Sequence, residues 1–257
     1  YQESASRKTA DKAINILQWL CVGGSMTVNW TSSFRTPPEV FDYLLGLVNG
    51  AGRTPDVVDI GAGTGQLTVG FAARDCRVIG VEPDDRMRQV LASREGIADT
   101  FAGSAEALPL PDSSADLIAG AQMWHWVDPS RAVPEIARVL RPGGVLAIVW
   151  SLRDDNEPWL KAMEQVVELP DSYKWFRKND IPVLAKPFGA MDLQEFAFTQ
   201  TSTPEGLVGL VGTFSHVALS DRRDKIEADV RELTQTHPDL AGKDVRGSVC
   251  LQGLHRP

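Results

Sequence analysis

The most constraining feature of the sequence is a short apolar run that leads into closely spaced glycines. Residues 57–65 read VVDIGAGTG. Residues with β-branched side chains favour a buried strand, and glycine lets the backbone approach a ligand where a Cβ atom would clash. The residues after Gly65 fit a helix, whose first N–H groups can bind a carboxylate or a phosphate. This segment predicts a strand, a tight turn and a helix beside a bound ligand.

Apolar strands and helices alternate through the first 150 residues. The sequence predicts strands at 57–60, 76–81, 99–102, 116–121 and 145–150. It predicts helices at 37–50, from 65, at 84–93 and at 129–140. Such alternation is typical of an α/β fold in which helices cover both faces of a parallel sheet, and right-handed crossovers leave few topologies. We therefore predict a doubly wound α/β domain.

The two ends of the chain depart from this pattern. Residues 10–21 carry apolar side chains at helical spacing and predict an amphipathic helix that Gly23 and Gly24 end. The second half predicts an edge strand, a charged helix and a final strand at 196–202, 219–235 and 248–254. We expect one domain over residues 1–257, made of a lid-like N-terminal helix, a cofactor-binding core, and a substrate lid with closing strands, at 1–25, 33–151 and 152–257.

A second acid lies where a nucleoside site would need it. The predicted strand 76–81 ends at Glu82, which follows Gly61 by 21 residues. A carboxylate at a strand tip can accept hydrogen bonds from both hydroxyls of a ribose. Dinucleotide enzymes place a third glycine where this chain has Gln66, which argues against an NAD(P)-dependent oxidoreductase. Asp59 and Glu82 could each be a solvated strand-end acid, but their combination indicates a nucleoside site.

Three further stretches carry a family resemblance. Together with residues 57–65, the runs 103–112, 116–126 and 141–146 resemble motifs of class I S-adenosylmethionine-dependent methyltransferases, including the menaquinone/ubiquinone-type branch. The likeness covers residues 35–151. It implies a Rossmann-like, seven-stranded sheet, S-adenosyl-L-methionine as cofactor, S-adenosyl-L-homocysteine as product, and a small-molecule substrate.

The resemblance also implies the cofactor-binding residues. In chain order they would contact the cofactor carboxylate (Arg35), its methionine portion (Asp59, Gly61, Gly63, with Gly65 closing the turn), the ribose (Glu82), the adenine face (Met87), the adenine amine (Ser104, Ala105, Glu106) and the sulfonium (Ala121, Gln122). Two residues depart from the pattern. Ser104 replaces a common aspartate at the amine contact, and Thr36 replaces the proline that usually follows the arginine.

Methyl transfer chiefly needs alignment of the acceptor and exclusion of water, and a base only where the acceptor loses a proton. His125 follows the fourth predicted strand, at the sheet edge where ligands bind, and is our candidate general base or substrate-orienting group. A structural, hydrogen-bonded histidine is the open alternative. Candidate substrate-binding residues are Trp124, Trp126, Trp150, Trp159, Trp175 and His216. Core packing would explain many of these aromatics equally well.

Charge, cysteine content and hydropathy argue against several classes of function. Lys and Arg number 26 against 34 Asp and Glu, a formal charge of −8, which disfavours nucleic-acid binding. The three cysteines form no CxxC pair, so we expect neither a metal site nor a disulfide framework. No apolar run predicts a membrane span. We expect a cytoplasmic homo-oligomer in which the N-terminal helix caps the site of its own or a neighbouring subunit.

The acceptor remains open at this point. Scattered aromatics and few basic residues favour an apolar small molecule, such as a secondary metabolite, and C-methylation of a terpenoid or indole would fit a likeness to teleocidin-type terpenoid-indole C-methyltransferases. The runner-up is a small carboxylic acid, as in the trans-aconitate branch, which residues 205–242 faintly resemble. A cofactor-binding protein without activity is a further alternative.

Overall fold

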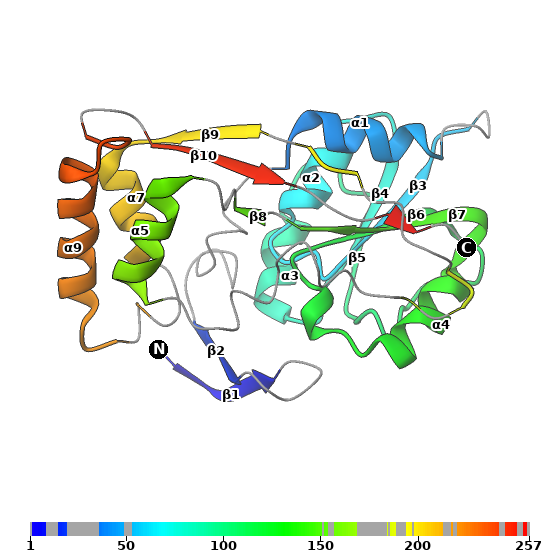
Figure 1. Ribbon diagram of the computed structural model, residues 1–257. Coiled ribbons are helices and arrows are strands. Elements are labelled where there is room, and N and C mark those ends of the chain that lie inside the picture. The colour runs from blue at the N-terminus through cyan, green and yellow to red at the C-terminus, as the bar shows by residue number, and fades with distance from the viewer. Residues whose placement is uncertain are drawn as a thin grey trace.

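The computed structural model (Figure 1) describes residues 36–48, 53–150, 157–168, 184, 186–188, 194–196, 203–212, 217 and 220–241. It also describes the backbone of strands at 2–8, 15–19, 152–153, 198–202, 245–250 and 254–255. The side chain of His125 lies outside these described parts.

A mixed six-stranded sheet forms the centre of the fold. Its strands are β3 (Asp56–Ile60), β4 (Arg77–Val81), β5 (Asp99–Phe101), β6 (Ala115–Ala121), β7 (Leu140–Val149) and β11 (Leu254–His255). The order is β11-β7-β6-β3-β4-β5, with β3 to β7 parallel and β11 antiparallel. The chain winds outward from β3 to β5 and then returns to β6 on the other side of β3. Ligands of such sheets bind at this reversal, beyond the carboxyl ends of the strands.

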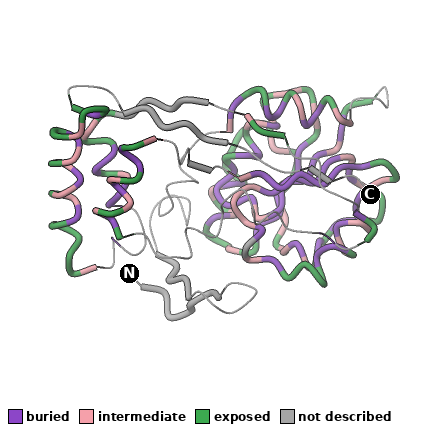
Figure 2. Tube along the Cα trace, viewed as in Figure 1, coloured by how far each residue is buried: buried purple, intermediate pink, exposed green. Residues whose placement is uncertain are grey.

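Helices cover both faces of this sheet, as predicted. They are α1 (Pro38–Gly46), α2 (Gln66–Ala72), α3 (Asp85–Ala92) and α4 (Pro129–Val139). Side chains alternate between the two faces of a strand, so Val57 packs with α1 and α2 whereas Val58 packs with α4. Figure 2 shows the buried residues concentrated in the strands between these layers. The doubly wound α/β fold is confirmed.

An ion-pair network joins the amino ends of three neighbouring strands. Arg141 of β7 contacts Asp116 of β6 at 3.0 Å and Asp56 of β3 at 2.8 Å. Asp116 also accepts the backbone N–H of Asp56 at 2.8 Å, and Arg53 contacts both acids. These contacts fix the edge of the sheet that lies opposite the carboxyl ends.

The second half of the chain contributes a helical group with its own core. Helices α5 (Pro158–Val167), α7 (Pro204–Gly212) and α9 (Arg223–Thr236) pack around Trp159 and Met163. Figure 1 shows this group to one side of the main sheet, with β9 (Phe198–Ser202) and β10 (Val245–Cys250) extending from it. Among these helices and those of the main sheet, none of the described stretches is long and apolar enough to cross a membrane.

The expected seven-stranded sheet is not found in the described residues. Strands β9 and β10 pair antiparallel, as predicted, but they join β8 (Leu152–Arg153) in a separate three-stranded sheet. Only β11 returns to the main sheet, beside β7. Alternating side chains identify a strand without identifying its partner, which is the physical reason for the error.

The predicted N-terminal helix is wrong where the structure describes it. Residues Asn15–Trp19 form strand β2, which pairs antiparallel with β1 (Gln2–Lys8). The remaining residues of the predicted helix lie outside the described parts. Residues 15–19 include three apolar side chains, Ile16, Leu17 and Trp19, which are too few to establish a helical period, and backbone pairing with β1 outweighs the weak intrinsic helix preference.

Candidate active site

The two predicted acids lie on the same face of the sheet. Asp59 pairs with Gly80 of β4, and Glu82 lies two residues beyond Gly80, so the strand period places both carboxylates on the side of α2. Both are buried, with exposures of 1% for Asp59 and 4% for Glu82. The negative charge of Glu82 acts on Asp59, in agreement with their proximity.

Glu82 holds two segments of backbone together. One carboxylate oxygen accepts the N–H of Gly63 in the glycine turn at 2.8 Å, and the other accepts the N–H of Asp84 at 2.9 Å. Asp84 in turn caps α3 by accepting the N–H groups of Arg86 and Met87 at 3.0 Å. Each carboxylate oxygen has two lone pairs, so a carboxylate can accept more than two hydrogen bonds.

Asp59 is held by a hydroxyl group of α2. Thr68 Oγ1 donates to Asp59 Oδ2 at 2.6 Å, and the Thr68 side chain is itself fully buried. The pKa of Asp59 is raised to about 7: burial is the main cause, the Thr68 hydrogen bond opposes the increase, and the charge of Glu82 adds to it. A cation placed beside Asp59 would favour its ionised form.

The glycine turn depends on the absence of side chains at two positions. Gly61 has φ +63°, and a Cβ atom there would lie 3.0 Å from Met123 Cβ, in the segment that follows β6. Gly65 has φ +89°, and a Cβ atom would lie 2.7 Å from Leu91 Cδ1 of α3. The turn after β3 therefore contacts the end of β6, at the reversal point of the sheet.

The charge of this site distinguishes between ligands. Two buried carboxylates beside one turn repel the pyrophosphate of a dinucleotide, whereas they attract an ammonium group and accept bonds from ribose hydroxyls. S-adenosylmethionine carries an amino group, a sulfonium and a ribose. The residues present therefore fit this cofactor.

The segment after β6 brings several predicted residues to the same sheet edge. Ala121 ends β6, and Gln122 adopts φ +55°, an uncommon conformation for a residue other than glycine. Its N–H donates to the Val149 carbonyl at 3.0 Å. The 3-10 helix η4 (Trp124–Trp126) follows and carries His125.

Apolar side chains surround η4. Trp124 is 5% exposed and belongs to a core cluster with Val127, Leu184 and Phe188, against which Trp150 packs. The indole N–H of Trp124 is buried and has no hydrogen-bond partner within the described residues. Trp126 is half-buried in the same segment. The sheet edge beside the glycine turn is thus largely apolar.

The predicted contacts to the adenine amine lie in the loop between β5 and β6, and the predicted contact to the adenine face, Met87, lies in α3. Ala105 and Met87 are buried, and Ser104 and Ala107 exchange backbone hydrogen bonds across a short antiparallel bridge. Glu106 Oε1 accepts the backbone N–H of Asp128 at 2.8 Å. The carboxylate of Glu106 therefore links the loop to the start of α4.

The structure does not bring all candidates together. Trp159 lies in the core of the helical group, 2% exposed and in a different cluster from Trp124. Arg35, Trp175 and His216 lie outside the described residues, as does the side chain of His125. For these residues the assignments stay predictions.

Sequence reasoning missed two residues of the site. Thr68 lies three residues after Gly65, on the buried side of α2, where a hydroxyl among apolar residues signals a polar partner. Asp84 precedes the first turn of α3, which is the common position of a capping aspartate.

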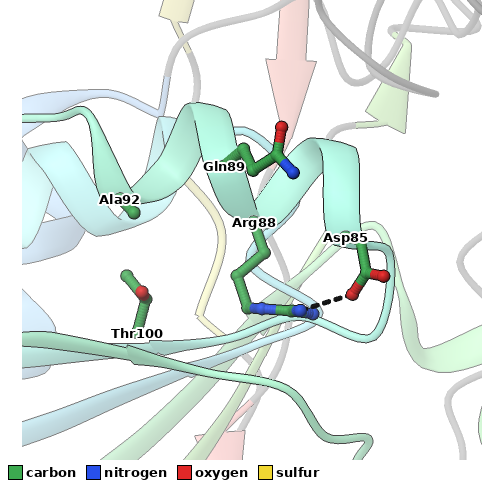
Figure 3. Close-up of a pocket in the computed structure, with 5 residues that line it drawn as sticks. All are labelled: Asp85, Arg88, Gln89, Ala92 and Thr100. Carbon is green, nitrogen blue, oxygen red and sulfur yellow. Dashed lines mark hydrogen bonds and ion pairs between the residues drawn. The ribbon is translucent and has the colours of Figure 1, made fainter.

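A shallow hollow elsewhere does not belong to this site. It is lined by Asp85, Arg88, Gln89 and Ala92 of α3 and by Thr100 of β5, with an ion pair between Arg88 and Asp85 (Figure 3). No predicted site residue contributes to its lining. Its position over the edge strand β5 separates it from the glycine turn.

Known proteins share both the sequence and the fold. Residues 58–148 match the model of a methyltransferase domain. An uncharacterized methyltransferase of Mycobacterium tuberculosis is 39% identical over 212 residues, which are 81% of this chain and 83% of the relative. The chain belongs to the S-adenosylmethionine-dependent methyltransferases.

A further relative and a solved structure of the same fold are also similar to this methyltransferase. An uncharacterized methyltransferase-like protein of Schizosaccharomyces pombe is 32% identical over 79% of this chain and 81% of its own. A solved protein from Anaeromyxobacter dehalogenans, assigned as a type II methyltransferase, has a TM-score of 0.67 at 23% identity, over 86% of this chain and 97% of its own, and shows the shared fold. The class I resemblance is confirmed, and the oxidoreductase alternative is wrong.

Proposed function

We propose that this methyltransferase binds S-adenosylmethionine against the turn at 61–65 and transfers its methyl group to an apolar small molecule. The observation that carries the proposal is the pair of buried carboxylates, Asp59 and Glu82, on one side of a glycine turn. Family membership supports the cofactor, and the apolar surroundings of Trp124 support the acceptor class.

Each residue then has a chemical role. Asp59 would accept the ammonium group of the methionine portion, and Glu82 would accept hydrogen bonds from the ribose hydroxyls. The apolar segment after β6 would exclude water and hold the acceptor in line with the methyl group, where alignment supplies much of the rate. The cofactor supplies an electrophilic methyl group on a neutral leaving group.

Binding titration tests the cofactor assignment. S-adenosylhomocysteine is expected to bind the full chain, and NADH is expected not to bind. Glu82→Gln should weaken S-adenosylhomocysteine binding by roughly tenfold or more, because an amide nitrogen replaces one acceptor oxygen. The exposed Glu95→Gln is the matched control and should bind like the wild type. Tight NADH binding, or equal affinities in the two variants, would contradict the proposal.

Product analysis tests the acceptor class. The chain is incubated with isotopically labelled S-adenosylmethionine and a metabolite extract, and mass spectrometry identifies compounds that gain one methyl group. We expect an apolar secondary metabolite, with C-methylation of a terpenoid or indole as the most specific form. Its label should resist mild alkaline hydrolysis.

A small carboxylic acid is the second candidate. A malonyl-[acyl-carrier protein] O-methyltransferase of Methylococcus capsulatus is 35% identical over 140 residues, about half of each chain. By analogy with that protein, the product here would be a methyl ester, whose label mild alkali releases. An alkali-labile product would favour this candidate over the apolar metabolite.

His125 remains our proposed base because η4 follows β6 at the proposed site. His125→Gln should lower kcat without changing the affinity for S-adenosylhomocysteine, if the acceptor loses a proton to this imidazole. Deletion of residues 1–25 tests whether the N-terminal segment caps the site or joins subunits. Unchanged turnover and unchanged oligomer size would remove that role.

A further inference from the structure

The loop between β5 and β6, residues 102–114, has little hydrogen bonding of its own. Its internal contacts include the short bridge between Ser104 and Ala107 and the hydrogen bond from Ser114 Oγ to the Pro111 carbonyl at 2.7 Å. The loop nevertheless packs closely on the sheet, since a Cβ atom at Gly103 would lie 3.0 Å from Val81 Cγ1. Val81 is the last residue of β4, so the loop packs against the carboxyl end of the strand that leads to Glu82.

One ion pair of α4 binds the middle of the loop. Glu135 Oε1 accepts the N–H of Leu108 at 2.7 Å, and Arg138 donates to the Leu108 carbonyl at 3.1 Å. Arg138 also donates to the Leu110 carbonyl at 2.9 Å and to Asp112 at 2.6 Å. The guanidinium of Arg138 contacts both oxygens of Glu135, at 2.9 and 2.8 Å, and lowers the pKa of that carboxyl.

The contacts of this ion pair are forked and directional. Both backbone polar groups of Leu108 are bound by α4, as they would be by a neighbouring strand. A planar guanidinium can hold two carbonyls and two carboxylates at once, which a lysine ammonium on a flexible stem does poorly. Leu108 and Leu110 are anchored beneath by burial in the core.

We infer that Glu135 and Arg138 are positioning residues for adenine recognition, because they fix the loop that carries Ser104, Ala105 and Glu106. This inference rests on the proposed function, in which that loop meets the adenine amine. The ion pair itself touches no ligand. Removal of the ion pair should let the loop move. The main effect should be a weaker preference for ligands with the adenine 6-amino group, and the loss of folding stability should be small.

The test compares two nucleosides that differ at one group. S-adenosylhomocysteine and S-inosylhomocysteine are titrated into the wild type and into Arg138→Met, which keeps much of the apolar stem. We expect the variant to bind S-adenosylhomocysteine about tenfold more weakly and to lose most of its preference over the inosyl analogue. Amide exchange at Ala107 and Leu108 should accelerate in the same variant.

Arg141→Met is the matched control. Its side chain is 30% exposed, against 33% for Arg138, and it also makes ion pairs, but at the opposite edge of the sheet. It should lower stability while leaving the adenosyl-to-inosyl preference unchanged. Arg138→Lys keeps the positive charge but loses the planar, two-pronged guanidinium. Its adenosyl-to-inosyl preference should lie between those of the wild type and Arg138→Met. This variant provides the test if Arg138→Met does not fold.

The outcomes separate the inference from the proposed function. A wild type that binds neither nucleoside overturns the proposed function, and the inference with it. A wild type that prefers the adenosyl compound, with an equal preference in the Arg138 variants, overturns the inference alone. A lost preference in Arg138→Met that Arg141→Met does not share supports it.

Discussion

Replacement of Asp59 by asparagine should change how stability depends on pH. Burial raises the pKa of Asp59 from 3.8 to about 7, so the folded chain holds this proton more tightly than the unfolded chain does. Stability contributed by this group is therefore greatest at low pH, falls as pH rises from about 4 through the folded pKa of about 7, and levels off about one pH unit above that. Asp59→Asn has no proton to lose and should lack this fall.

The size of the effect follows from the same shift. Through Asp59 the wild type loses roughly 1.4 kcal/mol per pH unit between pH 5 and pH 6 and less per unit near pH 7, where about half of the carboxyl is already ionised, so the loss from pH 5 to pH 7 is about 2 kcal/mol in all. We expect the difference in unfolding free energy between Asp59→Asn and the wild type to grow by this amount. The test compares how the unfolding free energy changes with pH, and not its absolute value. The asparagine amide adds a cost of its own that is the same at every pH.

Urea unfolding at pH 5, 6, 7 and 8 measures this difference. The exposed Glu95→Gln serves as control and should run parallel to the wild type at every pH. Parallel curves for Asp59→Asn and the wild type would refute the reasoning. Calorimetric titration in buffers of different ionisation enthalpy counts the protons released when the ligand binds, which adds a functional measure. S-adenosylhomocysteine binding at pH 6 should release a proton from the wild type and none from the asparagine variant.

Three other substitutions have outcomes that the geometry fixes. Gly70→Ala would place a Cβ atom 2.0 Å from Phe41 Cζ and should lower the unfolding free energy by about 2 kcal/mol or more in urea titration; an unchanged midpoint would contradict the packing of α1 on α2. Gly209→Ala, exposed within α7 and with open space around it, should instead raise stability by about 0.5–1 kcal/mol, and a lower midpoint would argue against a helix there. Asp116→Ala leaves the N–H of Asp56 without its side-chain acceptor and removes one of the two carboxylates that Arg53 and Arg141 bind, and should cost about 1–3 kcal/mol by the same measurement. Because Asp116 lies at the amino ends of the strands, its loss should not alter S-adenosylhomocysteine affinity, and a large change would place the ligand elsewhere.

The core of the fold could be predicted because its signals are local. Strands β3 to β6 lie within one residue of their predicted bounds, and β3 and β4 are short apolar runs bounded by glycine or charged residues. Strand β7 starts earlier, at Leu140, because residues 141–144 bulge within the strand, with Gly143 at φ +78°. The partners of β9 and β10 depend on long-range pairing, which alternation alone does not specify.

The site was predictable to the same extent. The acids Asp59 and Glu82 and the glycine turn stand out because their spacing follows directly from strand, turn and helix. The support of Thr68 and the bonds of Arg138 to the loop carbonyls depend on how separate helices pack on the sheet. A hydroxyl or a guanidinium in a helix has many possible partners, and only the three-dimensional arrangement selects among them.

Glu82 has a consequence for how such enzymes diversify. Its two oxygens already hold the amide of Gly63 and the amide of Asp84, so the proposed nucleoside recognition and the shape of the turn depend on one carboxylate. A substitution of Glu82 that changed the preferred nucleoside would also remove a hydrogen bond that holds the turn. Substitutions that change acceptor specificity are therefore expected in the segments after β6 and β7 and in the helical group. The residues of β3, β4 and the glycine turn should change less, because they set the shape of the turn.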